Sequence, residues 1–184
     1  MSAPSTWPAI VDAASAPYRI AGRFAWRFAR GKLGHDPVFR HVLIQGLIAP
    51  RAPVLDIGCG QDMREAPFPP VDTIVMLDVL HYITVPEQDA LLARVRAALP
   101  AGGVLLLRVG DATSKLRFRV SQWVDTVVTI VRGHRVTPQF GRPLSAWIAA
   151  LHALGFHVNS EPMSQGTPFA NVLMVARVRG GAAP

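Results

Sequence analysis

The chain has 184 residues, 50% of them hydrophobic, a net charge of +7 and a single cysteine. This length and hydrophobic content predict one folded domain with a core, and the lone Cys59 excludes an internal disulfide or a zinc cluster built from cysteines. The positive charge is compatible with nucleic acid or an anionic membrane as partner, and equally with solvated arginines from a biased composition.

The first residues contain no positively charged segment followed by an apolar one, and no run reaches the roughly 18 apolar residues of a membrane span. We therefore expect a cytoplasmic protein. His134, His152 and His157 are scattered and share no metal-ligand spacing, so no metal site is expected.

Residues 1–50 are expected to form an N-terminal arm and helices that act as a cap or lid. Residues 1–17 contain three prolines and predict a loose arm or short turns. Residues 18–33 place arginines and aromatic residues at helical spacing, which predicts an amphipathic helix ended by Gly31 and Gly34. Three interpretations stay open: a helix packed on the core, a lid over an apolar or acidic substrate, and a helix in peripheral contact with a membrane surface. A second helix is expected after Pro37.

Residues 54–57 predict a buried strand, and Gly58-Cys59-Gly60 follows it as a tight turn. Alone, this pattern is typical of a plain strand-to-turn glycine pair as much as of a cofactor loop. Residues 61–72 are rich in proline and too short for a long helix. Residues 73–77 predict a second buried strand that ends at Asp78.

Helices are predicted at residues 87–99, 116–131 and 143–154, strands at 104–109, from 156 and at 171–178, and a frayed tail at 181–184. Strands that alternate with helices predict an α/β fold with a largely parallel sheet. Ligands of such sheets bind at the carboxyl ends of the strands. The glycine turn and residues 78–81 would both lie there if the two strands are neighbours.

Four segments in this order resemble class I methyltransferases that use S-adenosylmethionine. They are Val-Leu-Asp-Ile-Gly-Cys-Gly at 54–60, the acid–Pro–Phe stretch at 62–72, Asp-Val-Leu-His-Tyr at 78–82, and Leu-Pro-Ala-Gly-Gly-Val-Leu-Leu-Leu at 99–107. Leu-Gly-Phe at 154–156 fits the C-terminal hairpin of that family. The resemblance implies a Rossmann-like sheet over residues 51–180 and S-adenosylmethionine as cofactor. A nicotinamide-binding motif fits less well, because its third glycine would fall on Met63.

The resemblance also implies a set of site residues. Gly58 and Gly60, with Cys59 between them, would let the backbone approach the methionine part of the cofactor, and Asp56 would hold its amino end. Asp62 would accept from the adenine amino group. Asp78, Val79 and Leu80 would line the cofactor, and His81 and Tyr82 would face the transfer site as catalytic residues. His81 is interpreted as a general base or, alternatively, as a packed or capping histidine, and Cys59 as a small residue that fills the turn rather than a reactive thiol.

The chain departs from the family pattern after Gly60. Only Gln61 separates the glycine turn from Asp62, where the family has two helices and two strands, and no residue can be assigned as the acid that holds the ribose hydroxyls. We interpret this as an internal deletion that reduces the sheet from seven strands to about five and moves the first strand to its edge. An exposed edge strand favours pairing with another chain, so we expect self-association there or coverage by the N-terminal helices.

The expected function is methyl transfer to a small or lipid-like acceptor, which the aromatic residues around Phe24, Trp26, Phe28, Trp123 and Trp147 would suit. The alternative is a methyltransferase-like remnant that has lost the cofactor site and acts as an interaction or membrane-surface protein. Nucleic-acid binding comes third, since no recognised module accompanies the arginines.

Overall fold

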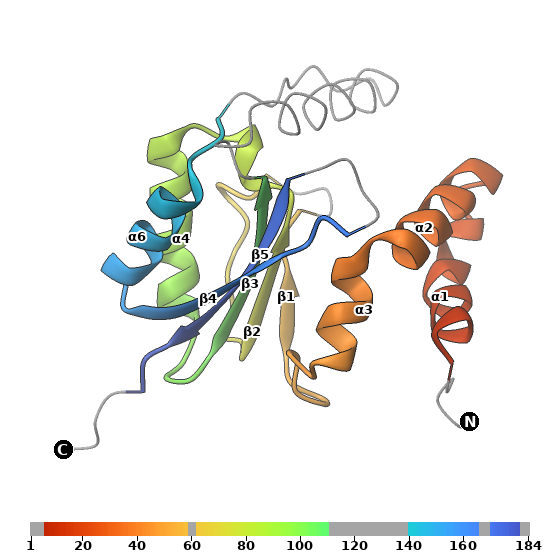
Figure 1. Ribbon diagram of the computed structural model, residues 1–184, viewed down its shortest axis with the longest axis horizontal. Helices are drawn as coiled ribbons and strands as arrows, with labels where there is room; N and C mark the ends of the chain where they lie inside the picture. Colours follow the sequence, from red (N-terminus) through yellow and green to blue (C-terminus); the bar gives the residue numbers. More distant parts are fainter. Residues whose placement is uncertain (1–5, 59–61, 111–139, 166–169, 181–184) are drawn as a thin grey trace. The chain divides into compact units, whose positions relative to one another are not determined.

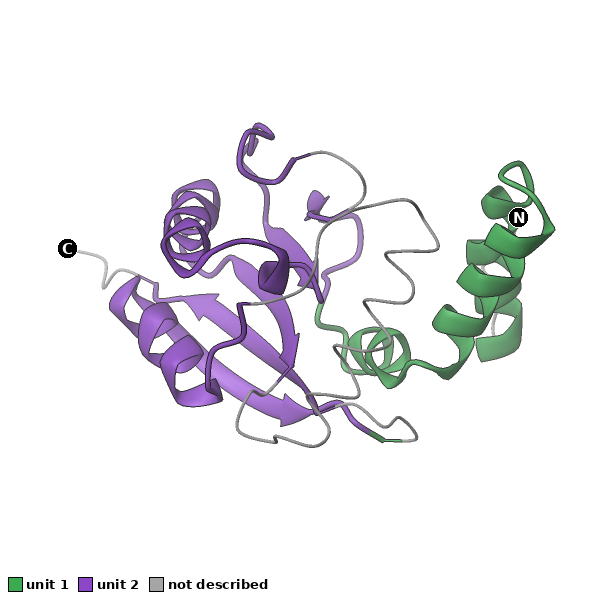
Figure 2. Ribbon diagram, turned by 90° about the horizontal axis from the view of Figure 1, so that it is seen from above, with its two compact units in different colours: residues 1–47, 165–167 green, residues 48–164, 168–184 purple. Residues whose placement is uncertain are grey.

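The protein's structure is a computed structural model that describes residues 6–58, 62–110, 140–165 and 170–180. The chain divides into two compact units (Figure 2). Unit 1 comprises residues 1–47 with 165–167, and unit 2 comprises residues 48–164 with 168–184. No helix of the described residues is long and apolar enough to cross a membrane.

Unit 1 opens with a helix where the prolines suggested a loose arm. Helix α1 spans Trp7–Ser15 and is followed by the 3-10 helix η1, Ala16–Arg19. Pro8 is compatible with α1 because it occupies the first turn, where a helix leaves its N–H groups without intrahelical partners. Val11 is buried against Gly34, and Asp12 accepts a hydrogen bond from Arg30 at 2.6 Å. The prediction for residues 6–17 is therefore wrong because tertiary packing on α2 stabilises this helix.

Helix α2 spans Arg23–His35, so the predicted amphipathic helix begins later and ends later than expected. Gly22 precedes it with a φ of +100°, and this non-helical residue separates η1 from α2. Gly31 and Gly34 lie inside the helix rather than ending it. Helix α3, Pro37–Ile44, confirms the second predicted helix, and the Asp36 side chain caps it by accepting from the Val38 N–H at 3.2 Å.

Unit 2 is built on one five-stranded sheet with the order β1-β2-β3-β5-β4 (Figure 1). Strands β1, β2 and β3 are parallel, and β5 runs antiparallel to both β3 and β4. The bounds are β1 Val54–Asp56, β2 Thr73–Leu77, β3 Val104–Gly110, β4 Phe156–Pro162 and β5 Asn171–Val178. The predicted α/β class and strand number are confirmed.

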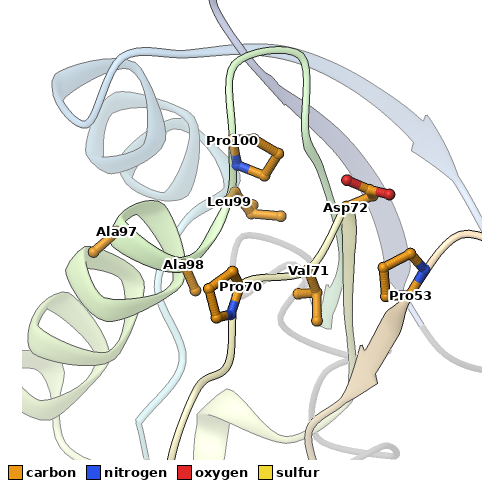
Figure 3. A pocket seen from close by; sticks show the side chains of 8 residues that line it. All are labelled: Pro53, Pro70, Val71, Asp72, Ala97, Ala98, Leu99 and Pro100. Atoms are coloured by element: carbon orange, nitrogen blue, oxygen red, sulfur yellow. The ribbon is translucent and has the colours of Figure 1, made fainter.

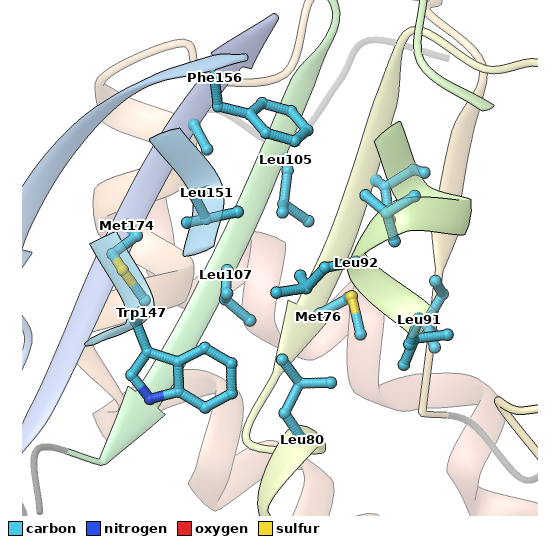
Figure 4. Close-up of a cluster of buried hydrophobic side chains, with 14 of the residues drawn as sticks. Met76, Leu80, Leu91, Leu92, Leu105, Leu107, Trp147, Leu151, Phe156 and Met174 are labelled. Carbon is cyan, nitrogen blue, oxygen red and sulfur yellow. The ribbon is translucent and has the colours of Figure 1, made fainter. Parts of the chain in front are cut away.

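Helices α4, Val85–Ala98, and α6, Leu144–Ala153, cover one face of the sheet (Figure 1). Their apolar side chains meet Leu105 and Leu107 of β3 in a fully buried cluster (Figure 4). Helix α4 begins two residues before its predicted start because Thr84 and Glu87 form a capping box. The predicted helix at 116–131 lies outside the described residues.

Strand β1 lies at one edge of the described sheet and pairs with β2 on one side. Val54 is 42% exposed, and the strand alternates exposed, half-buried, exposed. The prediction of a fully buried strand is therefore wrong for residues 54–56, which lie at the edge of the sheet, whereas Ile57 directly after the strand is buried. The predicted edge position itself is observed.

Candidate functional site

The glycine turn and the end of β2 meet at the carboxyl edge of the sheet. Strands β1 and β2 run parallel with Asp56 opposite Val75, so the chain leaves both strands at the same edge. Gly58 follows β1 with a φ of +129°, and a Cβ at this position would overlap Cγ1 of Val79. Gly58 is therefore required by both its backbone conformation and the close approach of the segment after β2.

Asp78 is held in a left-handed conformation by a buried arginine. Its φ is +58°, which aspartate tolerates better than most residues. Arg108 of β3 is 1% exposed and donates from Nε to Asp78 Oδ1 at 2.9 Å and from Nη2 to Oδ2. The Asp78 N–H also bonds to the Arg108 carbonyl at 3.2 Å. A bidentate pair of this kind fixes the carboxylate in place and compensates the charge of the buried guanidinium.

The 3-10 helix η2, Leu80–Tyr82, directs successive side chains to different surroundings. Leu80 is 1% exposed and belongs to the core (Figure 4). His81 and Tyr82 are half-buried, and their rings lie 4.2 Å apart between centroids. The two residues predicted as catalytic are thus adjacent and directly follow the Asp78–Arg108 pair.

A buried polar network ties this segment to two other parts of unit 2. The Gln88 amide nitrogen lies within hydrogen-bond distance of the carbonyls of Leu80, Ile83 and Phe140, at 2.9–3.1 Å. Its Oε1 accepts from Arg142 Nε at 2.7 Å, and Arg142 also bonds to the Val85 carbonyl and to Asp89. Buried polar groups are costly unless satisfied, so this network fixes η2 against α4 and residues 140–142.

Asp62 begins a segment that packs along α4. Arg94 donates to the carbonyls of Met63, Arg64 and Ala66 and stacks on Phe68, with its guanidinium 4.3 Å from the ring centroid. Asp62 itself bonds to the Arg64 guanidinium and to the Arg64 N–H, which lowers the pKa of its carboxyl to about 2. Arg64 reaches Glu87 at the start of α4 with an N–O distance of 3.2 Å. This carboxylate thus has a cationic partner of its own.

Asp56 contributes a carboxylate in a different environment. It is the last residue of β1, and burial raises the pKa of its carboxyl above the ordinary value. Cys59 and Gly60, predicted to complete the glycine turn, lie outside the described residues. No group of three potential metal ligands was found among the described His, Cys, Asp and Glu side chains.

A pocket of about 360 Å³ lies at the opposite end of these strands (Figure 3). It is bounded by the residues just before β1 and β2 and by the end of α4, with Asp72 as its acidic member. Ligands of open α/β sheets bind outside the carboxyl ends of the strands, so this pocket is separate from the candidate site.

Four residues that hold the site in place were not predicted from the sequence: Gln88, Arg94, Arg108 and Arg142. Arg108 could have been noticed in the sequence, because it is a charged residue inside an otherwise apolar strand. Arg94 has an ordinary position late in a helix by sequence, whereas its guanidinium bonds to the carbonyls of Met63, Arg64 and Ala66. Gln88 and Arg142 are separated by 54 residues, and no local pattern connects them.

The chain matches no family model and no curated protein in sequence. Among solved structures, it superposes on a SAM-dependent methyltransferase from Archaeoglobus fulgidus with a TM-score of 0.60 and 12% identity, over 84% of this chain and 99% of that one. It superposes on an O-methyltransferase family protein from Burkholderia thailandensis with a TM-score of 0.54 and 12% identity, over 89% of this chain and 62% of that one. For human N-acetylserotonin methyltransferase, solved in complex with SAM, the TM-score is 0.48 and the identity 18%, over 65% of this chain and 32% of that one. The fold is thus the Rossmann-like α/β fold of methyltransferases.

Proposed function

We propose that the protein transfers a methyl group from S-adenosylmethionine to a small or lipid-like acceptor. The observation that carries this proposal is the contact of Gly58 with Val79. It brings the glycine turn next to residues 78–82 at the carboxyl edge of a methyltransferase-like sheet. The SAM-dependent methyltransferase from Archaeoglobus fulgidus supports the same cofactor, and it and the O-methyltransferase family protein from Burkholderia thailandensis support the same reaction class.

The described residues fit one end of the cofactor better than the other. Asp56 offers a carboxylate for the amino group of the methionine part, and burial raises the pKa of this carboxyl above its ordinary value. The carboxylates of Asp62 and Asp78 are already bonded to Arg64 and Arg108. We assign Asp56 and Gly58 to the methionine end because of the resemblance of residues 54–60 and the contact of Gly58 with Val79, and Asp78 to shaping the loop through its left-handed backbone.

When bound, the cofactor supplies a methyl group on a positively charged sulfur, which an acceptor nucleophile attacks in line. The chain's main contribution is to hold the acceptor in position. His81 and Tyr82 follow Asp78 directly, and the Gln88–Arg142 network fixes their segment. In this proposal His81 accepts a proton from an oxygen or nitrogen acceptor, and Tyr82 packs beside it.

A specific observation favours a second candidate, a remnant that no longer binds the cofactor. Strand β1 pairs directly with β2, and residues 62–72 between them form turns without a strand. The strand whose terminal acid would hold the ribose has no counterpart in this described segment. An internal deletion, as interpreted from the sequence, would have this consequence, and the protein would then act through its surfaces.

Calorimetric titration of the full chain with S-adenosylmethionine and S-adenosylhomocysteine separates the two candidates. Micromolar affinity supports the methyltransferase, and no heat from a folded sample supports the remnant. Asp56→Asn should weaken binding about tenfold or more, since it removes a charged hydrogen-bond acceptor. Asp72→Asn is the matched control, because Asp72 lies at the amino end of β2.

A third variant tests the position of Asp62. Arg64→Gln removes the guanidinium that occupies the Asp62 carboxylate. If Asp62 accepts from the adenine amino group, this variant should change cofactor affinity. An unchanged affinity in Arg64→Gln together with Asp62→Asn would remove Asp62 from the site.

A further inference from the structure

Unit 1 carries an exposed surface that combines aromatic and cationic side chains. Ile20 is 96% exposed, Phe24 73%, Tyr18 51% and Phe28 40%. Arg23 and Arg27 are exposed on the same helix, one residue before each phenylalanine. We call these six residues, Tyr18, Ile20, Arg23, Phe24, Arg27 and Phe28, the aromatic–arginine face.

The arrangement of the two phenylalanines makes the apolar part of this face continuous. Phe24 and Phe28 lie one helical turn apart, and their rings stack with centroids 6.4 Å apart. Large apolar side chains scattered singly over a surface are ordinary, whereas contiguous ones mark an interaction site. The Phe24–Phe28 pair is of the second kind, and Tyr18 and Ile20 add two more exposed side chains in the segment just before α2.

The charges of unit 1 are distributed unevenly around α2. Residues 1–47 hold six Lys and Arg against two Asp, a net charge of +4. Arg30 is bonded to Asp12, and Arg19 lies over the Trp26 ring at 5.0 Å. Among the described residues, no ion pair to an acidic side chain is found for Arg23 or Arg27. The two arginines that flank the phenylalanines thus present their charge outward.

We propose that the aromatic–arginine face docks on the surface of an anionic lipid bilayer. Charge complementarity selects this partner, because arginines beside an anionic leaflet contribute about 1 kcal/mol each. Exposed phenylalanine and isoleucine add the apolar burial that interfacial helices need, and the polar remainder of α2 keeps the helix in the interface plane. This inference does not depend on the proposed methyl transfer, since it uses only residues of unit 1.

Co-sedimentation of the full chain with vesicles tests the proposal. We expect association with phosphatidylcholine vesicles that contain about 30 mol% phosphatidylglycerol and weak association with phosphatidylcholine alone. Arg23→Gln with Arg27→Gln should weaken association roughly 25-fold, about 5-fold for each charge. Phe24→Ser should weaken it while leaving the fold intact, because its side chain is already in solvent.

The matched control removes the same charge from unit 2. Arg177 and Arg179 are exposed near the end of β5, and the double variant Arg177→Gln with Arg179→Gln should keep most of the association. Equal loss in both double variants would overturn the proposal in favour of unspecific attraction by net charge. Binding of the face to RNA without vesicle association, or unchanged association of Phe24→Ser, would overturn it as well.

Discussion

Gly58 is the residue on which the geometry of the candidate site depends. Its φ of +129° is unfavourable for any side chain, and a Cβ would also overlap Val79. We predict that Gly58→Ala lowers the free energy of unfolding by about 3 kcal/mol, with part of it restored in the double variant with Val79→Ala. Urea unfolding followed by circular dichroism measures both.

Gly102 provides the control for this substitution. It has a φ of +78° in the turn before β3, with no atom within 4 Å of an added Cβ. The Gly103 N–H closes this turn by donating to the Pro100 carbonyl at 2.9 Å, and the Gly102 N–H donates to the Val178 carbonyl at 3.1 Å. Gly102→Ala should cost about 1 kcal/mol from backbone conformation alone. Equal decreases in the free energy of unfolding for Gly58→Ala and Gly102→Ala would mean that the overlap with Val79 does not destabilise the protein.

The Asp62 carboxyl has a pH dependence of its own. Hydrogen bonds from Arg64 lower its pKa from 3.8 to about 2 in the folded protein. Because the folded pKa lies below the unfolded one, the stabilising contribution is complete above about pH 4 and is lost as the pH falls through about 2. Carboxyl NMR titration should give this low midpoint, and Arg64→Gln should raise it towards 3.8. A midpoint near 3.8 in the unmodified protein would contradict the Arg64 contact.

Helix α4 connects η2 and residues 62–68 through side chains along its length. Glu87 caps the helix and meets Arg64, Gln88 holds η2, and Arg94 orders residues 63–68. We predict that Arg94→Lys speeds amide exchange in residues 62–68 by about tenfold, because one ammonium cannot reach three carbonyls and stack on Phe68. Hydrogen-exchange mass spectrometry resolves this segment.

Arg96 is the matched position on the same helix. Its guanidinium makes one bond of 3.4 Å, to the Leu99 carbonyl. Arg96→Lys should therefore leave exchange in residues 62–68 unchanged. If both variants gave the same exchange rates there, the ordering of this segment would have to come from another contact.

The elements that the sequence predicted well are those with a strong local pattern. Strands β2, β3 and β5 are rich in apolar and β-branched residues, and α4 and α6 carry apolar stripes. The spacing of the apolar residues and the flanking turn residues are therefore enough to predict these elements. Helix α1 was missed because its stability comes from packing of Val11 on Gly34. The position of Gly58 after β1 was predicted, whereas Arg142 and Arg108 could not be assigned partners, since contacts between residues far apart in the sequence follow only from the folded structure.

The whole sheet has two edges of different character. Strand β4 ends one side with Asn159, Ser160 and Glu161, and Pro162 closes it. Polar residues and proline are the usual protection of an edge against another chain. Strand β1 ends the other side with two apolar residues, Val54 and Leu55, and then Asp56. The sheet is thus protected by its own sequence at β4 and needs another protection at β1.

The Val54 amide reports directly on that protection. The Ile57 N–H bonds to Val75 of β2, so alternation along the strand directs the Val54 N–H away from β2. We predict that it is nevertheless protected from exchange in the full chain, by self-association or by coverage from residues 1–47. Protection that rises with concentration, with a matching change in sedimentation velocity, identifies self-association, and protection in a monomer identifies coverage. The Leu55 amide, directed towards β2, is the protected reference. A monomer in which Val54 exchanges as fast as an unstructured peptide would contradict both, and β1 would then be an open edge that tolerates solvent because it is only three residues long.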